Sequence, residues 1–309
     1  MSLEATSVDM NTQVPAKPVK ADSPWRIAVR RFIGNKLAFG GLIIVILMFL
    51  ICFLGPLFSP YNLYDYKLTD KNLAPNAAHW FGTDKLGRDI LLRTMLAGRI
   101  SLTVGLVATI ITVLVGATLG AVAGFYKGFV DTIIMRIADI FSSIPSVPIL
   151  IIFGTVLSDL KVDPANRIYF LMLSIGILSW MGLARLVRGQ ILTLREQEFM
   201  LATDALGLKD NRKIFRHLLP NTIPIIIVSA TLSVAGAILA ESALSFLGIG
   251  VIPPTPSWGN MISAANNLID FRKRPWLWIP PGMCILITVT AVNLIGDALR
   301  DALDPKMKK

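Results

Sequence analysis

The stretch Gln197–Asn221, QEFMLATDALGLKDNRKIFRHLLPN, is polar and basic and lies between two strongly apolar runs. Its first half contains good helix formers, and its apolar residues recur at three- and four-residue steps, which predicts one apolar helix face: Phe199, Ala202, Ala205 and Leu206. Gly207 then supplies a break. A second short helix is expected from Asn211 to Leu219, before Pro220 ends it. Two short helices with an apolar stripe are suited to being bound by another protein. An amphipathic connector lying on a lipid surface is the alternative.

The chain on either side of this stretch is too apolar for a soluble domain. Of its 309 residues 54% are hydrophobic, and charge-free runs recur along the sequence. A membrane span needs about twenty apolar residues. Six of the runs supply that number if one helical turn is added at an end. We therefore predict an all-α polytopic membrane protein with six transmembrane helices, at about 37–58, 101–125, 137–158, 168–188, 219–242 and 277–298.

The distribution of charge predicts how the chain is oriented. The net charge of +10 is carried between the apolar runs and not on one face, which argues against nucleic-acid binding. With the N-terminus inside, the inner segments hold 19 Lys and Arg residues and the outer segments hold 11. Both termini and a loop at 190–219 are then cytoplasmic, and the first outer loop is 59–99.

The N-terminal region divides into two parts. Residues 1–22 are polar and without apolar period, which predicts a disordered cytoplasmic tail. Ser23 and Pro24 are typical of a helix start, and residues 23–36 predict a basic amphipathic helix in the inner headgroup region of the membrane lipid. A simple extension of the first span is the alternative.

Glycines and prolines modify the second and third spans. Gly116, Gly120 and Gly124 recur every four residues, which predicts a ridge that another helix approaches closely. Pro145 and Pro148 are expected to bend or interrupt the third span.

Few charges fall inside the spans. Asp139 lies well inside one, and Glu241 lies at the end of another. An intramembrane acid is a functional candidate by default. The alternative is structural, with Asp139 paired to Arg136 one turn earlier and Glu241 reaching the outer interface.

Motifs for enzymatic chemistry are absent from the sequence. It has no G-x-x-x-x-G-K-[ST], G-x-S-x-G or H-E-x-x-H, and it holds two histidines, His79 and His217. Cys52 and Cys284 both lie in apolar runs, which argues against a disulfide framework or a metal site. We expect no catalytic residues, no metal site and no cofactor bound by this chain.

The basic stretch resembles a known motif. The spacing of Ala202, Gly207, Ile214 and Leu219-Pro220 is similar to the cytoplasmic loop of permease subunits of ABC importers, which docks into a cleft on the ATPase subunit. Leu201 stands where that family has Glu, and Thr203 replaces its second Ala. The resemblance implies these ATPase-coupling residues: Glu198, Ala202, Thr203, Asp204, Gly207, Ile214, Leu219 and Pro220.

Three further motifs resemble the C-type permease subunit of the dipeptide, oligopeptide and nickel branch of these importers. They are His79–Asp89 followed by Arg99–Leu102, Glu241–Gly248 followed by Pro253–Asn260, and Asn293–Pro305. The similarity extends from about Pro24 onward.

The first of these motifs carries charges in the outer loop. Asp84 with Arg88, and Asp89 with Arg93, stand at helix-pair spacing and are expected to form exposed ion pairs. Alternatively, Asp84, Arg88 and Asp89 contact a substrate-delivery protein.

The resemblance implies a type I ABC importer permease over residues 37–309, in a prokaryotic cytoplasmic membrane. Its implied partners are a second permease, two ATPase subunits that use ATP and Mg²⁺, and an extracellular solute-binding protein. The implied substrate is a di- or oligopeptide, with nickel or another small solute as the alternative. A stand-alone secondary transporter or channel is the rival from another class.

Overall fold

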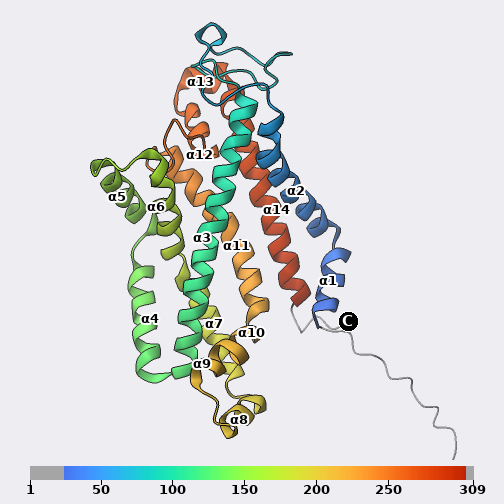
Figure 1. The fold of residues 1–309 in the computed structure, drawn as a ribbon, viewed down its shortest axis with the longest axis vertical. Helices are drawn as coiled ribbons and strands as arrows, with labels where there is room; N and C mark the ends of the chain where they lie inside the picture. Colours follow the sequence, from blue (N-terminus) through green and yellow to red (C-terminus); the bar gives the residue numbers. More distant parts are fainter. Residues whose placement is uncertain (1–23, 304–309) are drawn as a thin grey trace, which may run out of the picture.

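The computed structural model describes residues 24–303, so the tail expected at 1–22 lies outside the described residues. The described part is a long bundle of helices without β-strands, apart from an isolated bridge between Thr83 and Asp89 (Figure 1). One end carries the loop 59–89 and α13 (Leu268–Lys273), and we call it the loop end. The opposite end carries residues 197–221, α1 (Pro24–Gly34) and the end of α14 (Ile279–Leu303), and we call it the basic end.

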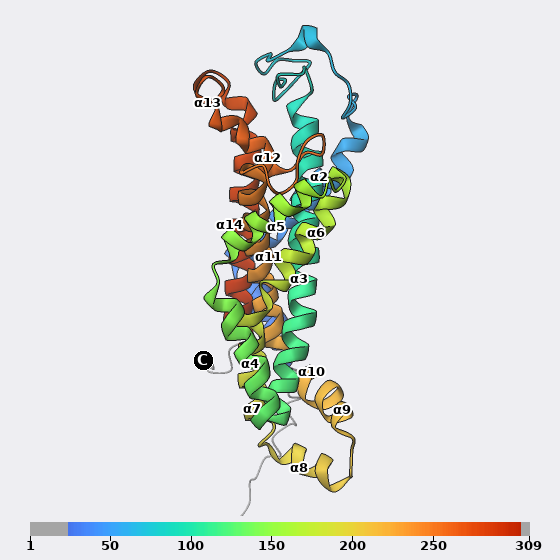
Figure 2. The ribbon, with the colours of Figure 1, turned by 90° about the vertical axis from the view of Figure 1, so that its left-hand side faces the viewer.

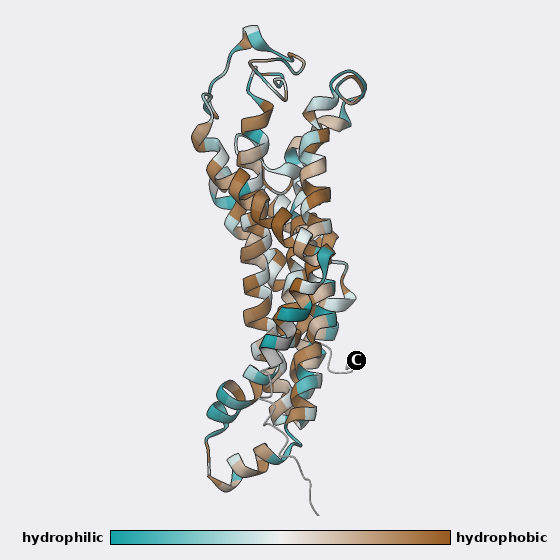
Figure 3. Cartoon of the chain, turned by 90° about the vertical axis from the view of Figure 1, so that its right-hand side faces the viewer, coloured by the Kyte–Doolittle hydropathy of each residue, from teal (hydrophilic) through white to brown (hydrophobic). Residues whose placement is uncertain are grey.

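Five helical segments are long and apolar enough to cross a membrane, and a bent helix pair makes up to six, counted over residues 24–303. In chain order they are α2 (Lys36–Leu54) with η1 (Gly55–Phe58), α3 (Ile90–Tyr126), the bent pair α4 (Gly128–Ser143) and α5 (Ser146–Asp159), α6 (Pro164–Ile177) with α7 (Trp180–Leu194), α11 (Ile223–Phe246), and α14 (Ile279–Leu303). The expected all-α, multi-span class is confirmed. Figure 3 shows apolar residues along the middle of the bundle and hydrophilic residues gathered toward its two ends.

Shorter elements complete the two ends of the bundle. The amphipathic helix α1 (Pro24–Gly34) lies beside the end of α14, and Asn35 separates it from α2 by capping that helix. At the loop end the connections contain η2 (Leu68–Asp70), α12 (Trp258–Ile262), η4 (Ser263–Asn266), α13 (Leu268–Lys273) and η5 (Pro275–Leu277). Figure 2 shows this end split into two prongs, the loop 59–89 and α13.

The central element is α3, which packs against α2, α6, α7 and α11. Asp89 caps its start by accepting a hydrogen bond from the Leu92 amide, so the helix takes up residues 90–99 of the expected outer loop. The expected glycine ridge is present. A Cβ at Gly116 would lie 2.9 Å from the Trp180 carbonyl oxygen, and one at Gly120 would lie 2.5 Å from that of Ala184, because α7 lies directly against α3.

The third span is broken, as the prolines predict. α4 ends at Ser143, α5 begins at Ser146 after Pro145, and the two helices are bent by 80°. Pro148 lies in the first turn of α5, where its missing N–H leaves no carbonyl without a partner. The break is therefore at Pro145.

Two ion pairs hold α4 to α7. The Arg188 guanidinium binds Asp131 through two nitrogens, at 2.5 and 2.6 Å. Arg185 lies 2.9 Å from Asp139. The expected pairing of Asp139 with Arg136 is wrong, because the partner comes from the neighbouring helix and not from the preceding turn.

Candidate functional site

Residues 197–221, which we call the coupling segment, form two helical parts around a tight turn. The first part is α8 (Glu198–Ala205). Gly207 ends it with φ +62°, and the Leu208 amide donates to the Thr203 carbonyl in the Schellman pattern. The second part runs through α9 (Asp210–Arg212), the π-helical turn η3 (Lys213–Leu218) and α10 (Leu219–Asn221).

The second part continues past Pro220, and the expectation that this proline ends the helix is wrong. Helical backbone continues to Asn221, and α11 begins at Ile223. The side chain of Asn221 donates to the His217 carbonyl at 2.6 Å, in the region where proline supplies no N–H. The coupling segment therefore passes into α11 with only Thr222 between them.

Buried side chains fix the coupling segment to the bundle. Met200, Ile214 and Leu218 are at most 2% exposed, and they pack in one cluster with Phe125 of α3 and Ile191 of α7. Burying such side chains contributes about 1.5–3 kcal/mol each. The segment is thus part of the folded bundle and not a loose connector.

Polar contacts complete the attachment. The Arg195 guanidinium donates to the Phe125 carbonyl and lies over the Phe125 ring. Lys213 Nζ lies 2.6 Å from Asp204, which ties α8 to the second part, and this hydrogen bond raises the pKa of Lys213. Asp204, three residues after Leu201, is therefore already paired within the segment.

The coupling residues implied by the resemblance separate into two groups. Thr203 and Ile214 face inward, and Thr203 donates a hydrogen bond to the Met200 carbonyl. Glu198, Ala202, Asp204, Gly207 and Pro220 are exposed, and Leu219 is half-buried. Around Ala202 the apolar side chains Leu201 and Leu206 are 68% and 76% exposed. We call this surface, made of Phe199, Leu201, Ala202, Ala205 and Leu206, the apolar face of α8.

At the loop end, Asp84 is the centre of a buried charge network. Its Oδ2 lies 2.8 Å from Nε and 2.7 Å from Nη2 of Arg88, and Arg93 Nε is 3.6 Å away. Its Oδ1 accepts from the amides of Leu86 and Arg88. The three charged side chains are at most 11% exposed.

Asp89 has different partners from those expected. Its Oδ2 lies 2.9 Å from His79 Nδ1, and its Oδ1 caps α3. The expected exposed pairs are therefore wrong in two respects: both acids are buried, and Arg93 approaches Asp84 instead of Asp89. Asp84, Arg88 and Asp89 all stabilise the fold of the loop, and their contact with a delivery protein stays a prediction.

Glu241 is a further site that sequence reasoning placed wrongly. It is fully buried in α11 and does not reach the outer interface. Its carboxylate accepts hydrogen bonds from Ser101 at 2.7 Å and Ser245 at 2.6 Å. The Ser101 hydroxyl in turn accepts a hydrogen bond from the Trp258 amide, and the Ser245 hydroxyl accepts one from the Val251 amide. Glu241 thereby joins α3, α11 and α12. Ser245 stands one helical turn after Glu241, which is a readable signal, but nothing local points to Ser101.

Comparison with known families gives two matches along the chain. Residues 116–309 match the family described as binding-protein-dependent transport system inner membrane component. Residues 23–75 match the N-terminal TM domain of oligopeptide transport permease C. This chain belongs to the binding-protein-dependent transport permeases. The family resemblance stated from the motifs is confirmed.

Individual relatives are similar to the permease over nearly its whole length. The oligopeptide transport system permease protein OppC of Bacillus subtilis (strain 168) is 41% identical over 290 residues, which cover 94% of this chain and 92% of the relative. OppC of Escherichia coli (strain K12) is also 41% identical, with 93% of each chain covered. The dipeptide transport system permease protein DppC of Alkalihalophilus pseudofirmus is 40% identical over 96% of the permease and 95% of the relative.

Proposed function

We propose that this chain is one membrane-spanning half of an ATP-driven importer of di- or oligopeptides in a prokaryotic cytoplasmic membrane. It pairs with a second permease, receives substrate from an extracellular binding protein at the loop end, and is driven by two separate ATPase subunits that use ATP and Mg²⁺. The names of its OppC and DppC relatives support a peptide substrate. Nickel or another small solute is the alternative cargo for the same machinery.

The observation that carries the proposal is the apolar face of α8. Leu201 and Leu206 stand exposed on a segment that Met200, Ile214 and Leu218 hold rigidly against the bundle. A group of exposed apolar side chains marks a contact with another protein or with a membrane. A lipid-surface connector needs no such buried anchors. The coupling segment is therefore suited to transmit force from a bound ATPase to α7 and α11.

In this mechanism the basic end lies in the cytoplasm, as the excess of Lys and Arg there favours. The ATPase pair changes shape when it binds ATP. The bundle follows only if the apolar face of α8 binds the two ATPase conformations with different affinity, because a contact of equal strength in both shifts no equilibrium.

The test is copurification. Ala202→Arg places a charge on the apolar face of α8 at an exposed position, so the chain is expected to insert and fold normally but to lose its ATPase subunits in a pull-down. Ala77→Arg changes an alanine that is also exposed but lies at the loop end, and this control is expected to retain them. Normal ATPase capture and peptide uptake by Ala202→Arg would refute the docking assignment. Peptide uptake by the purified chain alone, without nucleotide, would favour the rival stand-alone carrier.

A further inference from the structure

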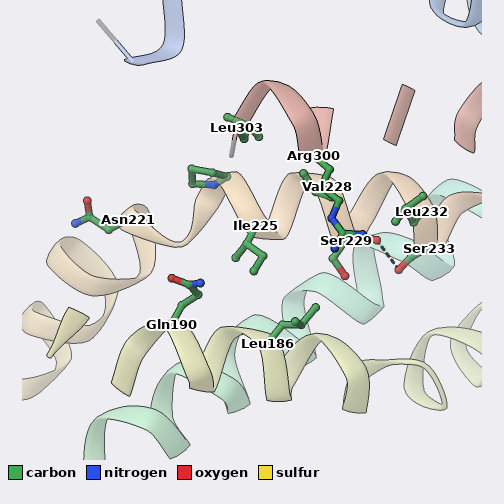
Figure 4. Close-up of a pocket in the computed structure, with 11 residues that line it drawn as sticks. Leu186, Gln190, Asn221, Ile225, Val228, Ser229, Leu232, Ser233, Arg300 and Leu303 are labelled. Carbon is green, nitrogen blue, oxygen red and sulfur yellow. Dashed lines mark hydrogen bonds between the residues drawn. The ribbon is translucent and has the colours of Figure 1, made fainter. Parts of the chain in front are cut away.

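A cavity of about 870 Å³ opens between α7, α11 and the end of α14, in the half of the bundle toward the basic end. Figure 4 shows Leu186 and Gln190 projecting from α7 toward α11, Ile225 projecting from α11 toward them, and Arg300 coming from α14. The cavity lies apart from the apolar face of α8 and from the charge network at the loop end.

The wall of the cavity formed by α10 and α11 is one helical stripe, with only Thr222 between the two helices. Asn221, Ile225, Ser229 and Ser233 follow at four-residue steps, so they share a face. Three of these four side chains carry an amide or a hydroxyl group, and Ile225 is aliphatic. A face that packs only on lipid or on another apolar helix has no use for such groups, because each costs free energy where it lacks a partner.

The polar groups of this lining have unused hydrogen-bonding capacity. Within residues 24–303, Gln190, Arg300 and the Ser229 hydroxyl make no hydrogen bond or ion pair with the protein. Asn221 donates through Nδ2, which leaves its carbonyl oxygen as an acceptor. The Ser233 hydroxyl donates to the Ser229 carbonyl.

The charge of the lining is positive. Arg300 is the one charged side chain that lines the cavity in the described part of the chain. Its neighbours on α14, Asp297 and Asp301, are outside the lining and form no ion pair with it in that part of the chain. A guanidinium beside amide and hydroxyl groups matches a carboxylate followed by peptide groups. The volume is in the range of small-ligand pockets and accommodates a short peptide.

We propose that this cavity is an inner binding site for the transported peptide. Arg300 binds its C-terminal carboxylate, and Gln190, Asn221 and Ser229 bind its backbone amides. The inference rests on the proposed function, since it takes a peptide as the cargo. It adds a site on this chain itself, so that selection for a free carboxylate does not depend on the binding protein alone.

The connectivity also makes the site responsive to the coupling segment. α7 runs into the segment and α11 runs out of it, so the segment joins the two walls of the cavity. A movement of the coupling segment against α3 therefore changes the distance between Gln190, on α7 before the segment, and Asn221, the last residue of the segment. Release of the peptide is thus controlled from the same place as docking.

The experiment measures whether substrate protects an engineered thiol from chemical labelling. The sample is the transporter complex, purified through a tag on this chain. In Ser229→Cys, a small water-soluble thiol reagent is expected to label residue 229, as read by mass spectrometry of the peptide that carries it. Trialanine at saturating concentration should slow labelling about tenfold, and trialanine amide should protect much less. Ser174→Cys on α6, outside the cavity, is the control and should show no protection.

A second variant tests the carboxylate contact. Arg300→Gln in the Ser229→Cys background should abolish the preference for trialanine over its amide. Arg30→Gln, which removes an exposed arginine of α1 outside the lining, should keep it. A preference that survives Arg300→Gln would overturn the role of Arg300.

Other outcomes overturn the site as a whole. A thiol at 229 that is never labelled would show that a partner helix fills the cavity. Protection that follows the content of anionic lipid instead of peptide would show a lipid site. ATP-dependent trialanine uptake by the wild-type complex is measured alongside: if it is absent, the proposed function fails, whereas uptake without protection at 229 refutes the cavity assignment alone.

Discussion

The two ends of the molecule use their side chains in opposite ways. At the loop end one group of charged residues is buried, and Asp84, Arg88 and Asp89 make their contacts within the loop. At the basic end, apolar Leu201 and Leu206 are turned outward, while other apolar residues of the same segment are buried beneath them.

This difference separates structural residues from contact residues. A buried acid that binds two arginines and two amides is needed by the fold, so its removal should affect folding. An exposed leucine on a rigidly held helix adds little to folding, so its removal should affect only a partner. The following substitutions test that contrast.

The largest effect is expected from Asp84→Ala. It leaves Arg88 and Arg93 buried without their acid, which costs about 3–5 kcal/mol of unfolding free energy. The measurement is unfolding of the purified chain in detergent, together with its yield in the membrane. Asp65→Ala in the same loop removes an exposed acid whose one partner among the described residues is the Asn62 amide, and it should cost under about 1 kcal/mol. Equal losses in the two variants would contradict a buried network centred on Asp84.

The coupling segment offers a matched pair of apolar truncations. Ile214→Ala opens a cavity in the buried cluster and should cost about 2–4 kcal/mol. Leu206→Ala should change stability by less than about 0.5 kcal/mol and weaken capture of the ATPase subunits instead. Both are measured by unfolding in detergent and by pull-down. A stability loss in Leu206→Ala as large as that in Ile214→Ala would mean that the apolar face of α8 is packed and not exposed.

Two glycines with positive φ compare the ends directly. Gly87 and Gly207 have φ of +75° and +62°. A Cβ at Gly87 would collide with the Lys67 carbonyl, whereas one at Gly207 meets nothing within 4 Å. Gly207→Ala should therefore cost only the backbone strain, about 1–2 kcal/mol, and Gly87→Ala about 2 kcal/mol more. Thermal unfolding of the two variants side by side gives the difference, and a smaller loss for Gly87→Ala would show that the loop end yields more easily than its contacts suggest.

The smallest effect is expected from Asp139→Asn. In the ion pair with Arg185, the Asp139 side chain is 59% exposed and the Arg185 side chain is 43% exposed. The pair should therefore contribute under about 1 kcal/mol to the unfolding free energy. Peptide uptake by the assembled transporter should stay within twofold of wild type. A tenfold loss of uptake with unchanged stability would instead give this acid a role in transport.

The sequence predicted those features that depend on residues close to one another along the chain. Apolar runs placed the long helices, Pro145 placed the break in the third span, and Gly207 placed the turn of the coupling segment. The ridge of Gly116 and Gly120 on α3 was equally readable, because a four-residue repeat fixes a helix face without knowledge of the neighbour.

Partner choice was not readable from the sequence. Arg136 stands close to Asp139 along the chain, yet the acid binds Arg185 of α7. Glu241 binds Ser101, which lies 140 positions away. In both cases the packing of whole helices decides which groups meet, and an apolar period specifies a face without specifying what covers it. The cavity at Arg300 was missed for the same reason, since its walls come from three separated helices.

The length of α3 has a consequence for how the two sides of the membrane communicate. Its 37 residues span about 55 Å, against about 30 Å of hydrocarbon. At one end of the helix, Asp89 caps the first turn and belongs to the folded loop. At the other end, Phe125 packs in the cluster that holds the coupling segment. If a helix of that length tilts by about 5° about one end, its other end moves by about 5 Å. In the importer proposed above, the delivery protein and the ATPase subunits would therefore act on opposite ends of this one helix.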